Sequence, residues 1–156
     1  MKLLVNQIHK LLIKKQKTIA TAESCTGGLL AKLLTEVAGS SHYYLLGMIT
    51  YSNKAKQALL KIPAGVIKRD GAVSKPVAIL MAQQIRKIAH ADFGVGITGI
   101  AGPGGGSRQK PVGTVLVAVS TNTNTVCKKF YFNGSRSAVR KKAVIASLTI
   151  LKALLR

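Results

Sequence analysis

The sequence has few acidic residues and few aromatic ones. Of its 156 residues only four are Asp or Glu, against 24 Lys or Arg, and aromatic side chains make up 4% with no Trp. No two carboxylates stand at a spacing suited to holding a metal ion, and no convincing His–Asp pair supports a Ser-His-Asp triad. We therefore expect a site without a metal or another cofactor.

Cysteine, proline and long apolar runs are scarce as well. The two cysteines, Cys25 and Cys127, lie far apart and form no CxxC pair, so reduced thiols are expected. No run approaches the roughly 18–20 uncharged apolar residues of a membrane span. The first ten residues lack the apolar core and cleavage site of a secretory signal. These absences predict a cytoplasmic protein that has no membrane partner.

The net charge of +20 bears on the class of partner. Such a charge attracts nucleic acid and phosphorylated small molecules. The basic residues, however, are spread along the chain, and none of the short clusters is interleaved with aromatic residues as in single-strand binders. The pattern favours a generally cationic surface over a nucleic-acid site.

Length and periodicity predict one globular domain over residues 1–156, of which 47% are hydrophobic. The fold class expected is α/β: a three-layer sandwich of one mixed sheet with helices on both faces. Apolar spacing and turn residues predict the following elements. Helices are expected over 2–16, 27–37, 52–60, 74–89 and 135–155, strands over 18–22, 43–51, 93–98, 113–120 and 125–132, and loops over 61–71 and 99–112.

The segment from Thr21 to Gly28 holds the first candidate site residue. Ser24 lies at a turn between a predicted strand and a predicted helix, where free N–H groups can hold an anion or a developing oxyanion. Ser24 is therefore placed like a nucleophile, and Gly27 and Gly28 would let a ligand approach the backbone. On this segment alone, a plain helix N-cap remains the alternative.

A second candidate is Tyr51-Ser-Asn-Lys54. Tyr51 ends a predicted strand and Lys54 begins a predicted helix, at the edge of the sheet where α/β proteins commonly bind ligands. A Lys in a partly dry pocket has a lowered pKa and can serve as the base for a Ser hydroxyl. A solvated Lys beside an edge Tyr is the alternative.

The Gly-rich loop from Gly99 to Gly106 follows a buried strand. It matches neither a Walker loop nor the dinucleotide fingerprint. Its glycines could bring backbone N–H groups against a phosphate or carbonyl, although a flexible surface turn explains the same composition.

Several motifs in order resemble the CinA C-terminal domain family, whose stand-alone members are nicotinamide-nucleotide amidases (PncC type). The resemblance covers about residues 4–155. The segments that carry it are Ala22–Gly28, Thr50–Lys56, Gly71–Ser74, Gly96–Gly106 and Lys110–Val115.

The resemblance implies hydrolysis of the carboxamide of nicotinamide mononucleotide to nicotinate mononucleotide and ammonia. The family's catalytic Ser, Tyr and Lys map onto Ser24, Tyr51 and Lys54, with Ser24 as nucleophile, Lys54 as base and Tyr51 bonded to that pair. Candidate substrate-binding residues are Glu23, Cys25, Thr26, Gly27, Gly28, Asn53, Thr98, Gly99, Gly102 and Arg140. Backbone N–H groups around Cys25–Gly27 would stabilise the oxyanion.

Family members commonly associate, so a homo-oligomer is expected. The alternative function is a non-catalytic binding module, linked to competence or DNA damage, that uses the cationic surface to hold nucleic acid or a protein.

Overall fold

The computed structural model describes all residues from 1 to 156. Its elements follow the predicted order, with one α-helix and one short 3-10 helix added. The helices are α1 (Lys2–Lys15), α2 (Leu29–Thr35), the 3-10 turn η1 (Ser40–His42), α3 (Asn53–Leu60), α4 (Ala64–Asp70), α5 (Lys75–Ile88) and α6 (Arg136–Leu154). The strands are β1 (Ile19–Glu23), β2 (Tyr44–Ile49), β3 (Phe93–Gly99), β4 (Thr114–Ser120) and β5 (Thr125–Tyr131).

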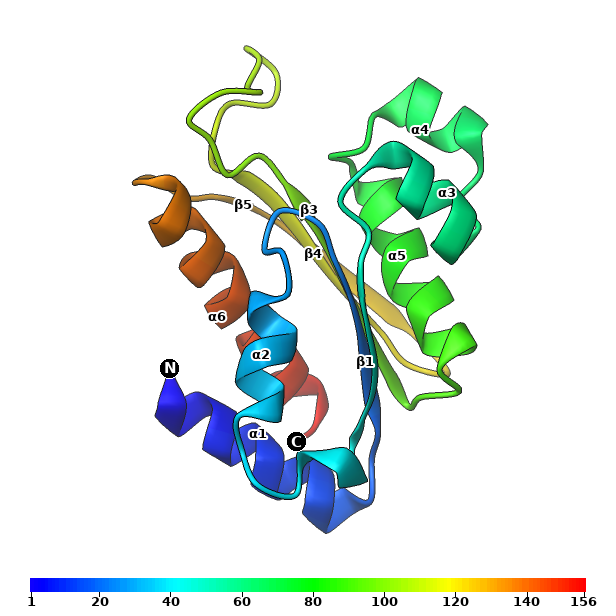
Figure 1. Ribbon diagram of the computed structural model, residues 1–156, viewed down its shortest axis with the longest axis vertical. Coiled ribbons are helices and arrows are strands. Elements are labelled where there is room, and N and C mark those ends of the chain that lie inside the picture. Colours follow the sequence, from blue (N-terminus) through cyan, green and yellow to red (C-terminus); the bar gives the residue numbers. More distant parts are fainter.

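The five strands form one mixed sheet in the order β2-β1-β3-β4-β5. Strands β2, β1 and β3 are parallel, and β4 and β5 continue the sheet antiparallel. Helices α1, α2 and α6 cover one face, and α3, α4 and α5 cover the other (Figure 1). The expected α/β sandwich is confirmed, and the carboxyl ends of β1, β2 and β3 meet at one edge of the sheet.

The loop expected over residues 61–71 is wrong, because this segment contains α4. Pro63 and Gly71 stand at its two ends, as N-cap and C-cap, rather than within a loop. Between them only seven residues are helical, too few for a periodic pattern to stand out in the sequence. Burial of Ile67 against the α5 side of the sheet stabilises this short helix.

Helix α5 packs closely on β3 because two strand positions are glycine. A Cβ added at Gly94 would lie 2.1 Å from the Ala82 carbonyl oxygen, and one at Gly96 would lie 2.6 Å from the Ala78 carbonyl oxygen. Any side chain at either position would therefore push the helix away. This close contact holds α5 against the sheet, below the edge where the parallel strands end.

Helix α6 is the longest helix and crosses the opposite face (Figure 1). Ser135 caps it as the sequence predicts, accepting a hydrogen bond from the Ala138 N–H. Its buried side, with Val139, Ala143 and Leu148, packs into the larger hydrophobic core. None of the helices combines the length and the apolar character needed to cross a membrane.

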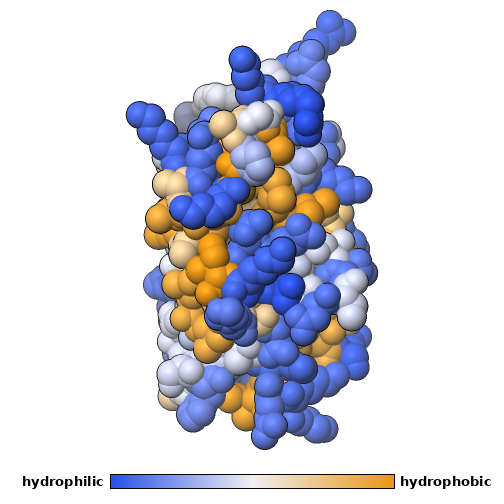
Figure 2. Space-filling model, turned by 90° about the vertical axis from the view of Figure 1, so that its right-hand side faces the viewer, coloured by the Kyte–Doolittle hydropathy of each residue, from blue (hydrophilic) through white to orange (hydrophobic).

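The two outer strands differ in how their free edges are protected. Strand β5 carries exposed Lys128 and Lys129, which hinder pairing with another strand. Strand β2 instead exposes Leu45 and Ile49 and carries no charged side chain. Figure 2, which views the α3–α5 side, shows several groups of apolar side chains among hydrophilic ones. The β2 edge is thus the less protected edge of the sheet.

Candidate functional site

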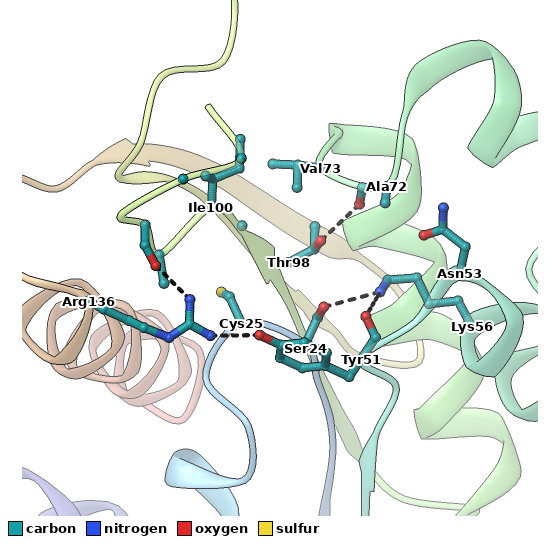
Figure 3. A pocket seen from close by; sticks show the side chains of 15 residues that line it. Ser24, Cys25, Tyr51, Asn53, Lys56, Ala72, Val73, Thr98, Ile100 and Arg136 are labelled. Carbon is teal, nitrogen blue, oxygen red and sulfur yellow. Dashed lines mark hydrogen bonds between the residues drawn. The ribbon is translucent and has the colours of Figure 1, made fainter. Parts of the chain in front are cut away.

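A pocket of about 260 Å³ lies where the parallel strands end (Figure 3). Five segments that are distant in the sequence line it: the turn after β1, the segment from β2 into α3, the approach to α5, the end of β3 with the Gly-rich loop, and the start of α6. The lining residues are Ser24, Cys25, Tyr51, Asn53, Lys56, Ala72, Val73, Thr98–Gly102, Gly104, Gly105 and Arg136.

Ser24 and Lys56 form a buried pair at the base of this pocket. The Lys56 Nζ lies 3.1 Å from the Ser24 Oγ and 2.8 Å from the Thr50 carbonyl oxygen. It also lies 3.5 Å from the Tyr51 carbonyl oxygen. Ser24 is 8% exposed and Lys56 is 1% exposed. A neutral amine can donate to both carbonyls and accept the Ser24 proton, so the geometry suits transfer of that proton to Lys56.

The burial of Lys56 shifts its titration toward the neutral amine. Burial lowers the pKa of Lys56 because a desolvated ammonium is costly. Cys25 would stabilise the ammonium only as a thiolate, but burial raises the pKa of the Cys25 thiol to about 11. At neutral pH the thiol therefore carries no charge, and it gives Lys56 no negative neighbour.

The structure does not bring Lys54 to Ser24, and that expectation is corrected. Lys54 is exposed on α3 and is absent from the pocket lining. Two residues later, Lys56 shares the buried side of α3 with Leu60, four positions further on. The available signal was Leu60, which lies one helical turn after Lys56 and marks the inward side of α3.

Tyr51 lines the pocket, but its hydroxyl does not bond the Ser24–Lys56 pair. The Tyr51 Oη lies 2.6 Å from an Arg136 nitrogen, and only the Tyr51 carbonyl approaches Lys56. The ring is 57% exposed at the mouth of the pocket. The expected contact between the Tyr51 hydroxyl and the nucleophile is therefore replaced by one with Arg136.

Glu23 shapes the turn rather than facing the pocket. Its carboxylate is 1% exposed and accepts hydrogen bonds from the N–H groups of Gly28, Leu30 and Ala31 at 2.8–3.1 Å. These are the N–H groups at the start of α2, so that helix end is already paired. The expectation that it holds a substrate anion, with Glu23 and Gly28 as substrate contacts, is corrected.

Two other N–H groups of the turn remain without an acceptor in the protein. The Ser24 N–H donates to the Ile97 carbonyl and the Gly27 N–H to the Ser24 carbonyl, whereas those of Cys25 and Thr26 have no such partner. Both follow Ser24 directly. Of the expected donors Cys25–Gly27, only the Cys25 N–H is both without a backbone acceptor and on a residue that lines the pocket, so it is the donor available to an oxyanion.

Arg140 reaches this turn from α6 but does not line the pocket. Its Nη2 and Nε lie 2.6 Å and 3.1 Å from the Thr26 carbonyl oxygen. Thr26 is fully buried, and neither it nor Gly27 reaches the pocket lining. Arg140 and Thr26 thus do not face the pocket as expected, because the guanidinium is directed to the backbone of the turn and Thr26 is enclosed, whereas substrate contact by the exposed Gly27 stays a prediction.

The remaining predicted residues do line the pocket. Asn53 stands at its rim, and Thr98, Gly99 and Gly102 form the wall at the end of β3. The Thr98 hydroxyl donates to the Ala72 carbonyl at 2.8 Å, which ties this wall to the segment before α5. The Gly-rich loop therefore belongs to the pocket rather than to a detached surface turn.

Arg136 is a lining residue that sequence reasoning missed. Its guanidinium donates to the Gly102 carbonyl at 2.7 Å and reaches the Tyr51 hydroxyl, so one side chain joins two walls of the pocket. Its position directly after the Ser135 cap was the only signal. No three His, Cys, Asp or Glu side chains come together as a metal site would require.

Known proteins resemble this chain along its whole length. The profile of the CinA C-terminal domain matches residues 1–155. A relative from Thermoanaerobacter pseudethanolicus, named as competence-damage inducible, is 47% identical over 145 residues, which is 93% of this chain and 35% of the relative. The chain thus spans about a third of the length of such curated relatives.

Solved structures match the fold closely. The competence/damage inducible protein CihA of Agrobacterium tumefaciens superimposes with a TM-score of 0.96 at 39% identity, covering 99% of this chain and 95% of that one. The competence damage-inducible protein A of Klebsiella pneumoniae gives a TM-score of 0.95 at 34% identity, covering 99% and 96%.

Proposed function

The chain belongs to the CinA C-terminal domain family, and we propose that it is an amidase acting on nicotinamide mononucleotide. The products would be nicotinate mononucleotide and ammonia. The observation that carries the proposal is the buried Ser24–Lys56 pair, whose two reacting atoms lie 3.1 Å apart in a pocket. The substrate is the one that the family resemblance suggests.

In the first step the Ser24 Oγ attacks the carboxamide carbon. Lys56, as the neutral amine, takes the hydroxyl proton and delivers it to the departing nitrogen, so that the C–N bond breaks and ammonia leaves. The product is an ester between Ser24 and the nicotinoyl group. Water then attacks this ester with Lys56 again as base, and the carboxylate is released with Ser24 restored.

The oxyanion that develops in both steps needs hydrogen-bond donors beside Ser24. The N–H group of Cys25 has no backbone acceptor, directly follows the nucleophile and lies in the pocket lining, so it suits this role. Each such donor contributes on the order of 3 kcal/mol to the transition state. The buried, neutral Cys25 side chain adds apolar surface to the wall beside it.

The phosphate of the substrate would lie at the mouth of the pocket. Arg136 lines it there and keeps N–H donors beyond the two that it uses on Gly102 and Tyr51. Gly104 and Gly105 line the same region, and their backbone can approach an anion closely. We therefore assign phosphate binding to Arg136 rather than to Arg140, which the sequence analysis counted among the substrate-binding residues.

The test is an ammonia-release assay with purified protein and nicotinamide mononucleotide, run beside nicotinamide riboside and free nicotinamide. We expect turnover of the mononucleotide that disappears in a Ser24→Ala variant. Absence of ammonia release from all three compounds, at enzyme concentrations that convert substrate within hours, would contradict the proposal.

The net charge of +20 favours one other function, a nucleic-acid binding module. Its test is the salt dependence of DNA retention. A steep slope, with retention persisting at physiological salt, would support this alternative. A mere surface-charge effect would disappear as salt rises.

A further inference from the structure

We infer that Arg140 is a positioning residue that holds the backbone of the nucleophile turn in its reactive shape. The inference rests on the proposed function, since it takes Ser24 as the nucleophile. It goes beyond that function by assigning to α6, more than a hundred residues away in the sequence, control over the backbone donor beside Ser24.

The contact of Arg140 with the turn is specific. Two nitrogens of one guanidinium converge on the Thr26 carbonyl oxygen, at 2.6 Å and 3.1 Å. The only other donor to this oxygen is the Leu29 N–H, at 3.3 Å. Because Thr26 is fully buried, water cannot replace a lost donor at no cost.

The turn is shaped to admit this guanidinium. Gly27 has a φ of +58°, and a Cβ added there would lie 3.4 Å from the Arg140 Nη2. A glycine therefore supplies the left-handed backbone of the turn, and the guanidinium packs directly beside it.

Arg140 and Glu23 form hydrogen bonds with opposite kinds of backbone group in the turn, a carbonyl and N–H groups respectively. The Glu23 carboxylate accepts the N–H groups of Gly28, Leu30 and Ala31, while Arg140 donates to the carbonyl of Thr26. The N–H groups left over are those of Cys25 and Thr26. Of these two residues Cys25 lines the pocket, and fixing the Thr26 carbonyl restrains the backbone that follows it, so loss of Arg140 should misdirect the Cys25 N–H, the donor of the oxyanion site.

The kinetic signature separates positioning from substrate binding. A positioning residue affects kcat, so Arg140→Ala should lower kcat about 100-fold while KM for the mononucleotide changes by less than about threefold. Arg140→Lys, with one donor group in place of two, should lie between. Lys141→Ala is the matched control: it removes a neighbouring cation of α6 that is exposed and makes no hydrogen bond, and kcat should not change.

Two measurements keep the inference testable whatever the substrate proves to be. The first is the rate at which a fluorophosphonate labels Ser24, in which the Oγ–P bond forms and fluoride leaves. This rate depends on the same backbone donor. The second is rescue: millimolar guanidinium chloride should restore several-fold of the labelling rate and kcat lost in Arg140→Ala.

Slower labelling of Arg140→Ala at unchanged KM, with rescue by guanidinium, supports the inference. Labelling as fast as in the unmodified chain, or a raised KM at unchanged kcat, overturns it. If Arg140→Ala does not fold, Arg140→Lys supplies the comparison. A chain that is labelled on Ser24 but releases no ammonia overturns the proposed function alone, and absence of both reactions overturns the two together.

Discussion

The side chains of Ser24 and Lys56 meet although 32 residues separate them in the sequence, with Oγ and Nζ 3.1 Å apart. Ser24 follows β1 and Lys56 lies in α3, which follows the neighbouring parallel strand β2. Parallel pairing thus brings a hydroxyl and an amine to one edge of the sheet. The other polar neighbours of Lys56 are the carbonyls of Thr50 and Tyr51, so no carboxylate pairs with the amine.

Replacing Ser24 by Ala should abolish amide hydrolysis without unfolding the protein. The variant loses the attacking oxygen, and loss of a nucleophile lowers kcat by at least about 1000-fold. Stability should change little because Lys56 keeps its 2.8 Å bond to the Thr50 carbonyl. Ammonia release and a thermal melt of the same sample test both statements, and turnover within a few-fold of the unmodified enzyme would exclude Ser24 as nucleophile.

The two lysines of α3 should behave oppositely. Lys56→Arg keeps a positive charge but cannot deprotonate, so it should be as inactive as Lys56→Ala, about 1000-fold below the unmodified enzyme. Lys54→Ala, on the exposed side of the same helix, should retain activity within about twofold. Steady-state kinetics on the three variants decides the matter. An inactive Lys54→Ala beside an active Lys56→Ala would restore the assignment made from the sequence.

The fold was largely predictable because each long element carries a local signal. Buried strands such as β4 read as continuous apolar runs, and Ser74 and Ser135 cap their helices as their spacing indicates. Helix α4 was missed because its stability comes from tertiary burial of Ile67 rather than from its own pattern. Short helices are the elements whose sequence signal is weakest.

The candidate site was predictable only where one segment supplies the residues. Ser24, Cys25 and the Gly-rich loop could be found because their function is tied to a local turn. The roles of Arg136 and Arg140 depend on where α6 meets the turn after β1, which no local pattern reveals. Which lysine of α3 faces inward depends on the phase of the helix, and the spacing from Tyr51 alone does not fix it.

The phosphate of the substrate should matter, and Arg136 should be the reason. Charge-assisted contacts are worth roughly 1.5–3 kcal/mol each, so kcat/KM for nicotinamide riboside should be about 10- to 100-fold lower than for the mononucleotide. Arg136→Gln should raise KM for the mononucleotide and affect the riboside far less. Arg108→Gln, an exposed change two residues after the Gly-rich loop and outside the pocket lining, is the control. Equal kcat/KM for the two substrates would contradict a phosphate site.

Glu23→Gln should destabilise the fold much more than Glu36→Gln. The Glu23 carboxylate is buried and accepts hydrogen bonds from three backbone N–H groups. The side-chain amide of Gln offers only one acceptor oxygen, and its NH2 group would face backbone N–H donors. We expect a loss of about 2–4 kcal/mol in the free energy of unfolding. Glu36 forms an exposed ion pair with Lys32, one helical turn earlier. Glu36→Gln should therefore lower the free energy of unfolding by less than about 1 kcal/mol. Urea denaturation of the two variants measures the difference, and equal losses would refute the role given to Glu23.

Both the activity and the stability of the protein should depend on pH through the titration of Lys56. Burial lowers its pKa below the ordinary value near 10.5, and the base must be neutral. Activity should therefore rise with pH along one ionisation below 10.5.

Between the folded and unfolded pKa values of Lys56 the unfolded chain binds more protons, so the free energy of unfolding should also rise with pH in that window and stay flat below it. Urea denaturation of the unmodified chain and of Lys56→Met across pH isolates the contribution, since the variant lacks the titrating group. A difference between the two that grows in favour of the variant as pH rises would have the opposite sign and would show that Lys56 is held as the ammonium.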